Sequence, residues 1–151
     1  MESNSYLALA QRDLQNAREL FYVTSTGYNL VARLAQQGVE KMMKHFIEKL
    51  SHEDFIPLLG THNTVRLYNA ILSLGLIAEN RAHRKELLLL KNYYFDTNYP
   101  GENYIEIDRE TAQEALDFAT MFVDMLLVAD QPVEDAPTTK NNSPSDTFTM
   151  G

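Results

Sequence analysis

The sequence predicts an all-α fold, an antiparallel up-and-down bundle of four to five helices. Apolar residues recur at steps of three and four over most of residues 1–129, which is the period of amphipathic helices. No segment alternates polar and apolar residues for long enough to form a sheet. The helical segments are separated by short connections, so we expect neighbouring helices to pack antiparallel.

The first helix is expected over residues 5–22, with Ser5 as its N-cap. Its apolar side chains share one face: Leu7, Ala10, Leu14, Ala17 and Phe21.

The second helix is expected over residues 28–50, about six turns. Its apolar residues come in doublets four residues apart: Leu30/Val31, Leu34/Ala35, Gly38/Val39, Met42/Met43 and Phe46/Ile47. Between them runs a polar edge of Gln36, Gln37, Glu40, Lys41 and Lys44. This helix is therefore the best candidate both for the core and for a site.

The next two helices follow a loop that contains Pro57 and Gly60. The third should begin near residues 61–63 and turn Val65, Tyr68, Ile71, Leu72 and Gly75 inward. The fourth should run from about residue 77 to residue 95 and bury Leu87, Leu88, Leu90 or the Lys91 stem, and Tyr94. A turn at Pro100-Gly101 then ends the helical pattern.

The fifth helix is expected to start at a capping box formed by Thr111 and Glu114 and to end near Ala129. Beyond it, residues 130–151 contain three of the five prolines and few large apolar residues. Such a segment cannot offset the entropy lost on ordering, so we expect a bundle domain over residues 1–129 and a disordered tail over residues 130–151.

Composition limits the function. The chain has no cysteine, which excludes thiol catalysis and disulfides, and its start lacks a basic and apolar leader. We therefore expect a cytoplasmic protein that does not enter a membrane. The net charge of −8 argues against non-specific nucleic-acid binding. Residues 12–91 nevertheless carry eleven Lys/Arg against eight Asp/Glu, which leaves room for a local anion site.

Several segments together resemble the HEPN domain family. They are residues 6–14 with Ala17, residues 35–44, His62, Tyr94, the Asn98-Tyr99-Pro100-Gly101 turn, and Ala115 with Phe118-Ala119. Residues 36–44, Gln-Gln-Gly-Val-Glu-Lys-Met-Met-Lys, are the most specific part. The resemblance covers about residues 5–128. It implies a helical bundle, a homodimer, a nucleotide or RNA ligand, and a small nucleotidyltransferase as partner.

The chain departs from the family pattern where the chemistry would lie. Ribonuclease members carry an Arg followed after four to six residues by a His, and none of His45, His52, His62 and His83 has such an Arg. Asn98 also stands where the family often has Arg before Tyr-Pro. The resemblance therefore implies a binding module and assigns no catalytic residue, no metal and no cofactor.

The ligand-binding candidates are Gln37, Lys41, Lys44, His62, Arg66 and Tyr99. The two lysines could hold a phosphate as point charges, with Tyr99 stacking on a base. A polar network that only fixes the helix register explains Gln37, Lys41 and Lys44 as well. In such a network Lys41 would pair with Gln37 or Glu40, and Lys44 with Glu40 or Glu48. His62 and Arg66 stand four residues apart and could replace the missing ribonuclease pair. The alternatives are thus a metal-independent ribonuclease toxin and a purely structural dimer whose acidic last helix docks a basic protein.

Overall fold

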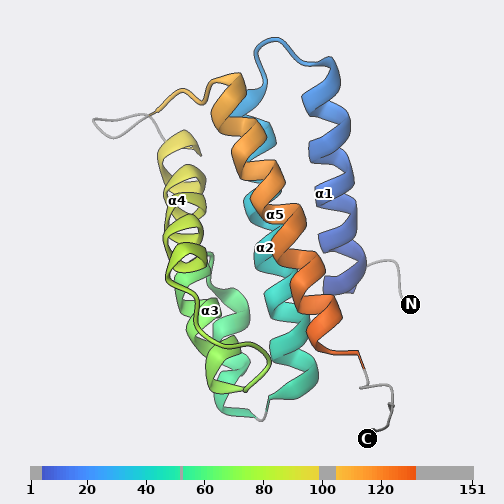
Figure 1. Ribbon diagram of the computed structural model, residues 1–151, viewed down its shortest axis with the longest axis vertical. Helices are drawn as coiled ribbons and strands as arrows, with labels where there is room; N and C mark the ends of the chain where they lie inside the picture. The colour runs from blue at the N-terminus through green and yellow to red at the C-terminus, as the bar shows by residue number, and fades with distance from the viewer. Residues whose placement is uncertain (1–4, 52, 99–104, 132–151) are drawn as a thin grey trace, which may run out of the picture.

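The structure, a computed structural model, describes residues 5–51, 53–98 and 105–131. These residues form five α-helices and one 3-10 helix, which confirms the predicted all-α bundle. The elements are α1 (Tyr6–Val23), α2 (Tyr28–Leu50), η1 (Glu53–Gly60), α3 (Thr64–Ser73), α4 (Arg81–Asn98) and α5 (Arg109–Ala129). In Figure 1, α1 and α4 run in one direction and α2 and α5 in the other, as the up-and-down prediction requires.

The long helix α2 lies at the centre of the bundle. Among the described helices it is the one that contacts all four other α-helices (Figure 1). Four of the five apolar doublets are buried or partly buried, whereas Leu30 of the first is 41% exposed. Burial on several sides explains why α2 carries apolar residues on more of its circumference than a surface helix does.

Gly38 brings α1 and α2 close together. A Cβ atom at this position would lie 2.6 Å from Cγ of Leu14 and 2.7 Å from its Cδ2. Glycine in a helix interior costs about 1 kcal/mol relative to alanine. Here the missing side chain leaves the space that Leu14 fills, so the close approach of the two helices offsets that cost.

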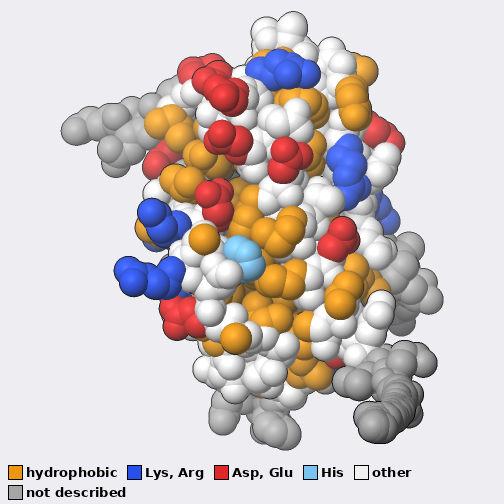
Figure 2. Space-filling model, in the orientation of Figure 1, with side chains coloured by type: hydrophobic (Ala, Val, Ile, Leu, Met, Phe, Trp, Pro, Cys, Tyr) orange, Lys and Arg blue, Asp and Glu red, His pale blue; other side chains and the backbone are white. Residues whose placement is uncertain are grey.

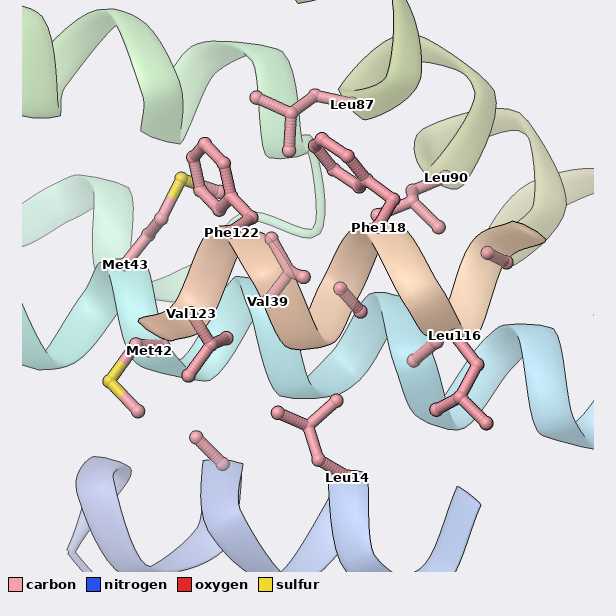
Figure 3. Packing of buried hydrophobic residues seen from close by; sticks show 14 of the residues in the cluster. Leu14, Val39, Met42, Met43, Leu87, Leu90, Leu116, Phe118, Phe122 and Val123 are labelled. Atoms are coloured by element: carbon pink, nitrogen blue, oxygen red, sulfur yellow. The ribbon is translucent and has the colours of Figure 1, made fainter. Parts of the chain in front are cut away.

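One part of the core lies where α5 and α4 pack onto α2. Figure 3 shows Phe118 and Phe122 of α5 directed toward Leu87 of α4, with Val39 of α2 beneath them. The rings of Phe118 and Phe122 stack with centroids 5.4 Å apart. Burial of such large apolar side chains supplies the main favourable free energy of folding.

Several predicted helix ends are confirmed and others are wrong. Ser5 caps α1, accepting a hydrogen bond from the Ala8 amide, and Asn63 caps α3. Helix α4 starts at Arg81 and not at residue 77, because Gly75 turns the chain with φ 79° and the Asn80 side chain accepts from the His83 amide. Helix α5 starts earlier than the predicted capping box, since Asp108 caps it by accepting from the amide of Thr111.

Three further predictions about the middle of the chain fail. The segment with Pro57 and Gly60 is the 3-10 helix η1 and not a loop. On α4, Leu87 and Leu90 are buried, but Leu88 is 46% exposed and Leu89 is 43% exposed. Neighbouring residues on a helix point about 100° apart, so a run of four leucines cannot all face one core. Gly75, expected inside α3, lies beyond its end.

The described part of the chain contains no helix that combines the length and the apolar character of a membrane span. The predicted turn at Pro100-Gly101 lies outside the described residues, as does nearly all of the predicted tail.

Candidate ligand-binding site

The polar edge of α2 divides into two groups. Gln37 and Lys41 are partly exposed, whereas Gln36, Glu40 and Lys44 are buried. The Lys41 ammonium lies 2.6 Å from the carboxylate of Asp13 on α1. The sequence suggested local partners on α2 for Lys41, but the structure gives it a partner on another helix. Lys41 therefore links α1 to α2.

The buried group forms a charged network inside the bundle. The Lys44 ammonium lies 2.7 Å from Oε2 of Glu40, and their side chains are 6% and 4% exposed. This ion pair, one turn apart on α2, confirms one of the pairs expected from the sequence. Gln36 donates its amide nitrogen to Oε1 of Glu40 at 2.9 Å. The amide oxygen of Gln36 is buried and has no hydrogen-bond partner among the residues that the structure describes.

His62 connects this network to the surface. Its Nδ1 lies 3.1 Å from Oε1 of Glu40, yet its side chain is 48% exposed. The ring stacks on that of Tyr94 in α4, with centroids 4.7 Å apart and planes 24° apart. The contact to Glu40 uses Nδ1 and fixes the ring orientation.

Backbone contacts hold this histidine in place. His62 precedes the N-cap of α3, and its carbonyl oxygen accepts a hydrogen bond from the side-chain Nε2 of Gln36 at 3.4 Å. The hydroxyl of Thr64, two residues later, donates to the carbonyl of Leu87 in α4 at 2.7 Å. The start of α3 is therefore tied to both α2 and α4. Next to Tyr94, burial and then the Glu86 carboxylate raise the pKa of Tyr93, which keeps its phenol neutral.

Arg66 and Tyr99 do not join this group. Because His62 lies before α3, it does not share a helix face with Arg66. Arg66 lines a separate hollow of about 260 Å³ with Leu58 of η1 and residues of α3. Tyr99 lies outside the described residues. Of the predicted ligand residues, the structure brings together Lys44 and His62, through Glu40.

The charged cluster at the start of α4 is only partly solvated. Arg84 lies 2.9 Å from the Glu79 carboxylate and 5.1 Å from the centre of the Tyr68 ring. His83 packs against the rings of Phe118 and Phe122, each at 6.0 Å. These contacts give the cluster a role in holding α4 against α3 and α5.

The sequence reasoning missed a second hollow, between α1 and α5. Its volume is about 430 Å³, and it is lined by Arg18, Phe21, Tyr22, Arg109, Gln113, Leu116, Asp117, Thr120 and Met121. Arg18 and Tyr22 are four residues apart and share one face of α1, which is a signal for this hollow in the sequence. Arg109 could not be assigned to the hollow from the sequence, because α5 was expected to begin after it.

Comparison with known proteins gives one match. The family model described as "HEPN domain" matches residues 3–129. No curated protein and no solved structure matches the chain.

Proposed function

The chain belongs to the HEPN domain family, and we propose that it is a non-catalytic binding module that holds a nucleotide or a segment of single-stranded RNA. Membership of the family connects the chain with nucleotides and RNA in general. The chain lacks the Arg/His spacing of the ribonuclease members, which supports binding over cleavage.

The observation that carries the proposal is the stacked pair of His62 and Tyr94. The His62 side chain is 48% exposed and stacks on the partly buried ring of Tyr94, so it offers a platform for an unpaired base, and each such stacking contact contributes about 1 to 3 kcal/mol. The platform is held from below by Glu40, whose own position is fixed by Lys44 and Gln36. A ring held in this way loses little entropy when a ligand binds.

The lysines take a supporting role in this proposal. Lys44 is buried and paired with Glu40, and Lys41 is paired with Asp13, so both charges are compensated inside the protein. Cleavage of RNA needs a cation or a hydrogen-bond donor that stabilises charge on the phosphorus centre, and the charges of Lys41 and Lys44 are already compensated by carboxylates. Lys91, three residues before Tyr94, shares its face of α4, and we expect it to meet a phosphate beside the platform.

The test is binding of a labelled single-stranded RNA by fluorescence anisotropy. We expect His62→Ala to weaken binding by about 1 to 3 kcal/mol, because one base loses its stacking partner. His62→Phe keeps the ring and should recover most of that loss. Val128→Ala, which truncates a 66% exposed side chain on α5, is the control and should bind like the unmodified chain.

Two outcomes count against the platform. Equal binding by His62→Ala and the unmodified chain would remove it as the site, and an equal loss of binding in Val128→Ala would show that the effect of His62→Ala is not specific to the platform. The same samples test the ribonuclease alternative, which is favoured by the hydrogen bond between Glu40 and His62, since such a carboxylate orients a general base. Metal-independent cleavage that His62→Ala abolishes would replace the binding proposal with that alternative.

We also propose that the module is a homodimer that uses α4. Leu88 and Leu89 are adjacent on α4 and both exposed, which is the kind of apolar surface that a second copy covers. Light scattering at micromolar concentration should give twice the chain mass of 17.3 kDa. Leu88→Glu should give the monomer mass, while Val128→Glu, at an exposed site on α5, should remain dimeric. A monomeric unmodified chain would contradict the proposal.

A nucleotidyltransferase is the partner that we propose for this module in the cytoplasm, as the family resemblance implies. Residues 92–130 carry one Arg against nine Asp/Glu, so a basic face of the partner would complement them. In the purely structural alternative, the same acidic surface would dock a basic protein without any nucleotide or RNA.

A further inference from the structure

The hollow between α1 and α5 has an apolar floor and an exposed rim. Its volume is about 430 Å³. Among the residues that line it, Phe21 and Leu116 are 5% and 6% exposed, so they form the floor. Tyr22 of α1 and Met121 of α5 stand at the rim, since they are 85% and 42% exposed. A hollow of this kind can receive one large apolar side chain.

Two arginines add positive charge to this lining. Arg18 contacts the neutral side chains of Gln15 and Thr120, at 3.4 and 3.5 Å. The Arg109 guanidinium lies 4.7 Å from the centre of the Phe21 ring. Phe21 and Arg18 are three residues apart and therefore neighbours on α1, so the two charges lie over adjacent parts of this helix. In Figure 2, Lys/Arg side chains lie over α1 and over the upper end of α5.

The charge of the two arginines is not compensated within the described parts of the chain, where neither has a carboxylate partner. Asp117, the carboxylate among the lining residues, accepts a hydrogen bond from Gln113 at 3.0 Å. In a chain of net charge −8, this lining is thus net positive. A guanidinium whose face lies on an aromatic ring still presents its N–H edge, which matches a carboxylate. The lining therefore favours an acidic ligand.

The exposure of the rim decides between a small molecule and a polypeptide. Four of the lining residues are exposed: Tyr22, Arg109, Asp117 and Met121. A pocket for a small molecule buries roughly 70 to 90% of the ligand surface, which so open a hollow does not do. An extended polypeptide can place one side chain in the hollow and continue over the rim. Tyr, Arg and Met are also residue types that are enriched at protein interfaces.

We propose that this hollow docks an acidic segment of a partner protein. The segment inserts one large apolar side chain, aromatic or leucine, against the floor, and its neighbouring carboxylates meet Arg18 and Arg109. Arg109 is the one Arg of residues 92–130, whose other charges are acidic and require a basic partner, so the hollow selects a segment of the opposite charge. The hollow shares no residue with the platform of His62 and Tyr94, so the inference goes beyond the proposed function and does not depend on it.

Selection of short random peptides, displayed on phage, against the full chain tests the proposal. The double variant Arg18→Glu/Arg109→Glu serves for counter-selection, which removes peptides that bind other surfaces. We expect the enriched peptides to carry Asp or Glu beside Phe, Trp, Tyr or Leu. Enrichment of peptides without acidic residues would overturn the proposal, as would the absence of any enrichment after counter-selection.

Fluorescence anisotropy with an enriched peptide measures the contribution of each arginine. Arg18→Gln and Arg109→Gln should each weaken binding about tenfold or more, because each change removes charge-assisted hydrogen bonds. A peptide whose acidic residues are replaced by lysine should bind the Arg18→Glu/Arg109→Glu variant more tightly than it binds the unmodified chain, which a merely structural role of the arginines would not produce. Arg81→Gln, at an exposed arginine on α4, is the matched control and should bind the original peptide like the unmodified chain.

Other results would assign the peptide or the hollow differently. Peptide binding that His62→Ala abolishes and both arginine variants leave unchanged would assign the peptide to the platform and overturn the proposal. If light scattering gave a dimer for the unmodified chain and a monomer for Arg18→Glu/Arg109→Glu, the hollow would hold a second copy of this chain and not a partner. Neither arginine is buried, so the melting temperatures of the variants should equal that of the unmodified chain while peptide binding is lost.

Discussion

Replacing Phe46 by alanine is expected to lower the free energy of unfolding by about 3 to 5 kcal/mol. Phe46 lies on α2 and is 1% exposed, so its removal leaves a cavity at the centre of the bundle. The neighbouring helices cannot collapse into that space without disturbing their other contacts with α2. Equilibrium unfolding in urea measures the effect, at one fixed protein concentration because a dimer would couple stability to concentration.

The matched control is Leu30→Ala on the same helix. Leu30 is 41% exposed, and we expect this change to cost about 1 kcal/mol or less. A cost below about 1 kcal/mol for Phe46→Ala would show that α2 is rotated relative to the arrangement described above.

The second large effect concerns the buried ion pair of Glu40 and Lys44. Glu40→Met should lower the free energy of unfolding by about 3 to 5 kcal/mol, because it leaves the Lys44 ammonium buried without its carboxylate. The double change of Glu40 and Lys44 to methionine should recover most of that loss, since two apolar side chains of similar volume need no partner. Urea unfolding of both single variants and the double variant gives the coupling between the two residues.

Lys41→Met provides the comparison. The partner of Lys41 is also a carboxylate, that of Asp13, but the Lys41 side chain is 25% exposed. We therefore expect this change to lower the free energy of unfolding by about 1 kcal/mol. If Glu40→Met cost no more than Lys41→Met, the Lys44 ammonium would reach water in the folded protein, and the network beneath His62 would not be rigid. The RNA-binding proposal would then lose its physical basis.

The sequence was sufficient to predict most of the helices, because the signals that define a helix, apolar periodicity and capping residues, are local. The apolar periodicity of α1, α2 and α5, the cap at Ser5 and the end near Ala129 depend on residues within a few turns of one another. Errors appeared where a distant contact or a single capping group decided the outcome. Asn80 and Asp108 set the starts of α4 and α5, and neither stands out from the apolar pattern.

The candidate sites were predictable only in part, for the same reason. The Lys44–Glu40 pair is one turn apart on α2 and was expected. Asp13, the partner of Lys41, is 28 residues away from it in the chain, and His62, which contacts Glu40, is 22 residues away from Glu40. Both contacts became visible only in the folded bundle. The stacking of His62 on Tyr94 and the hollow between α1 and α5 likewise join segments that the sequence cannot place side by side.

By itself, then, the sequence determined the fold class, the family resemblance and the absence of the ribonuclease spacing, because periodicity and motif spacing are properties of one continuous segment. The tertiary structure decided which polar residues are buried, which charges are compensated, and which remain for a ligand. Helix packing decides these features, because burial and charge compensation depend on the side chains that other helices bring to the same place.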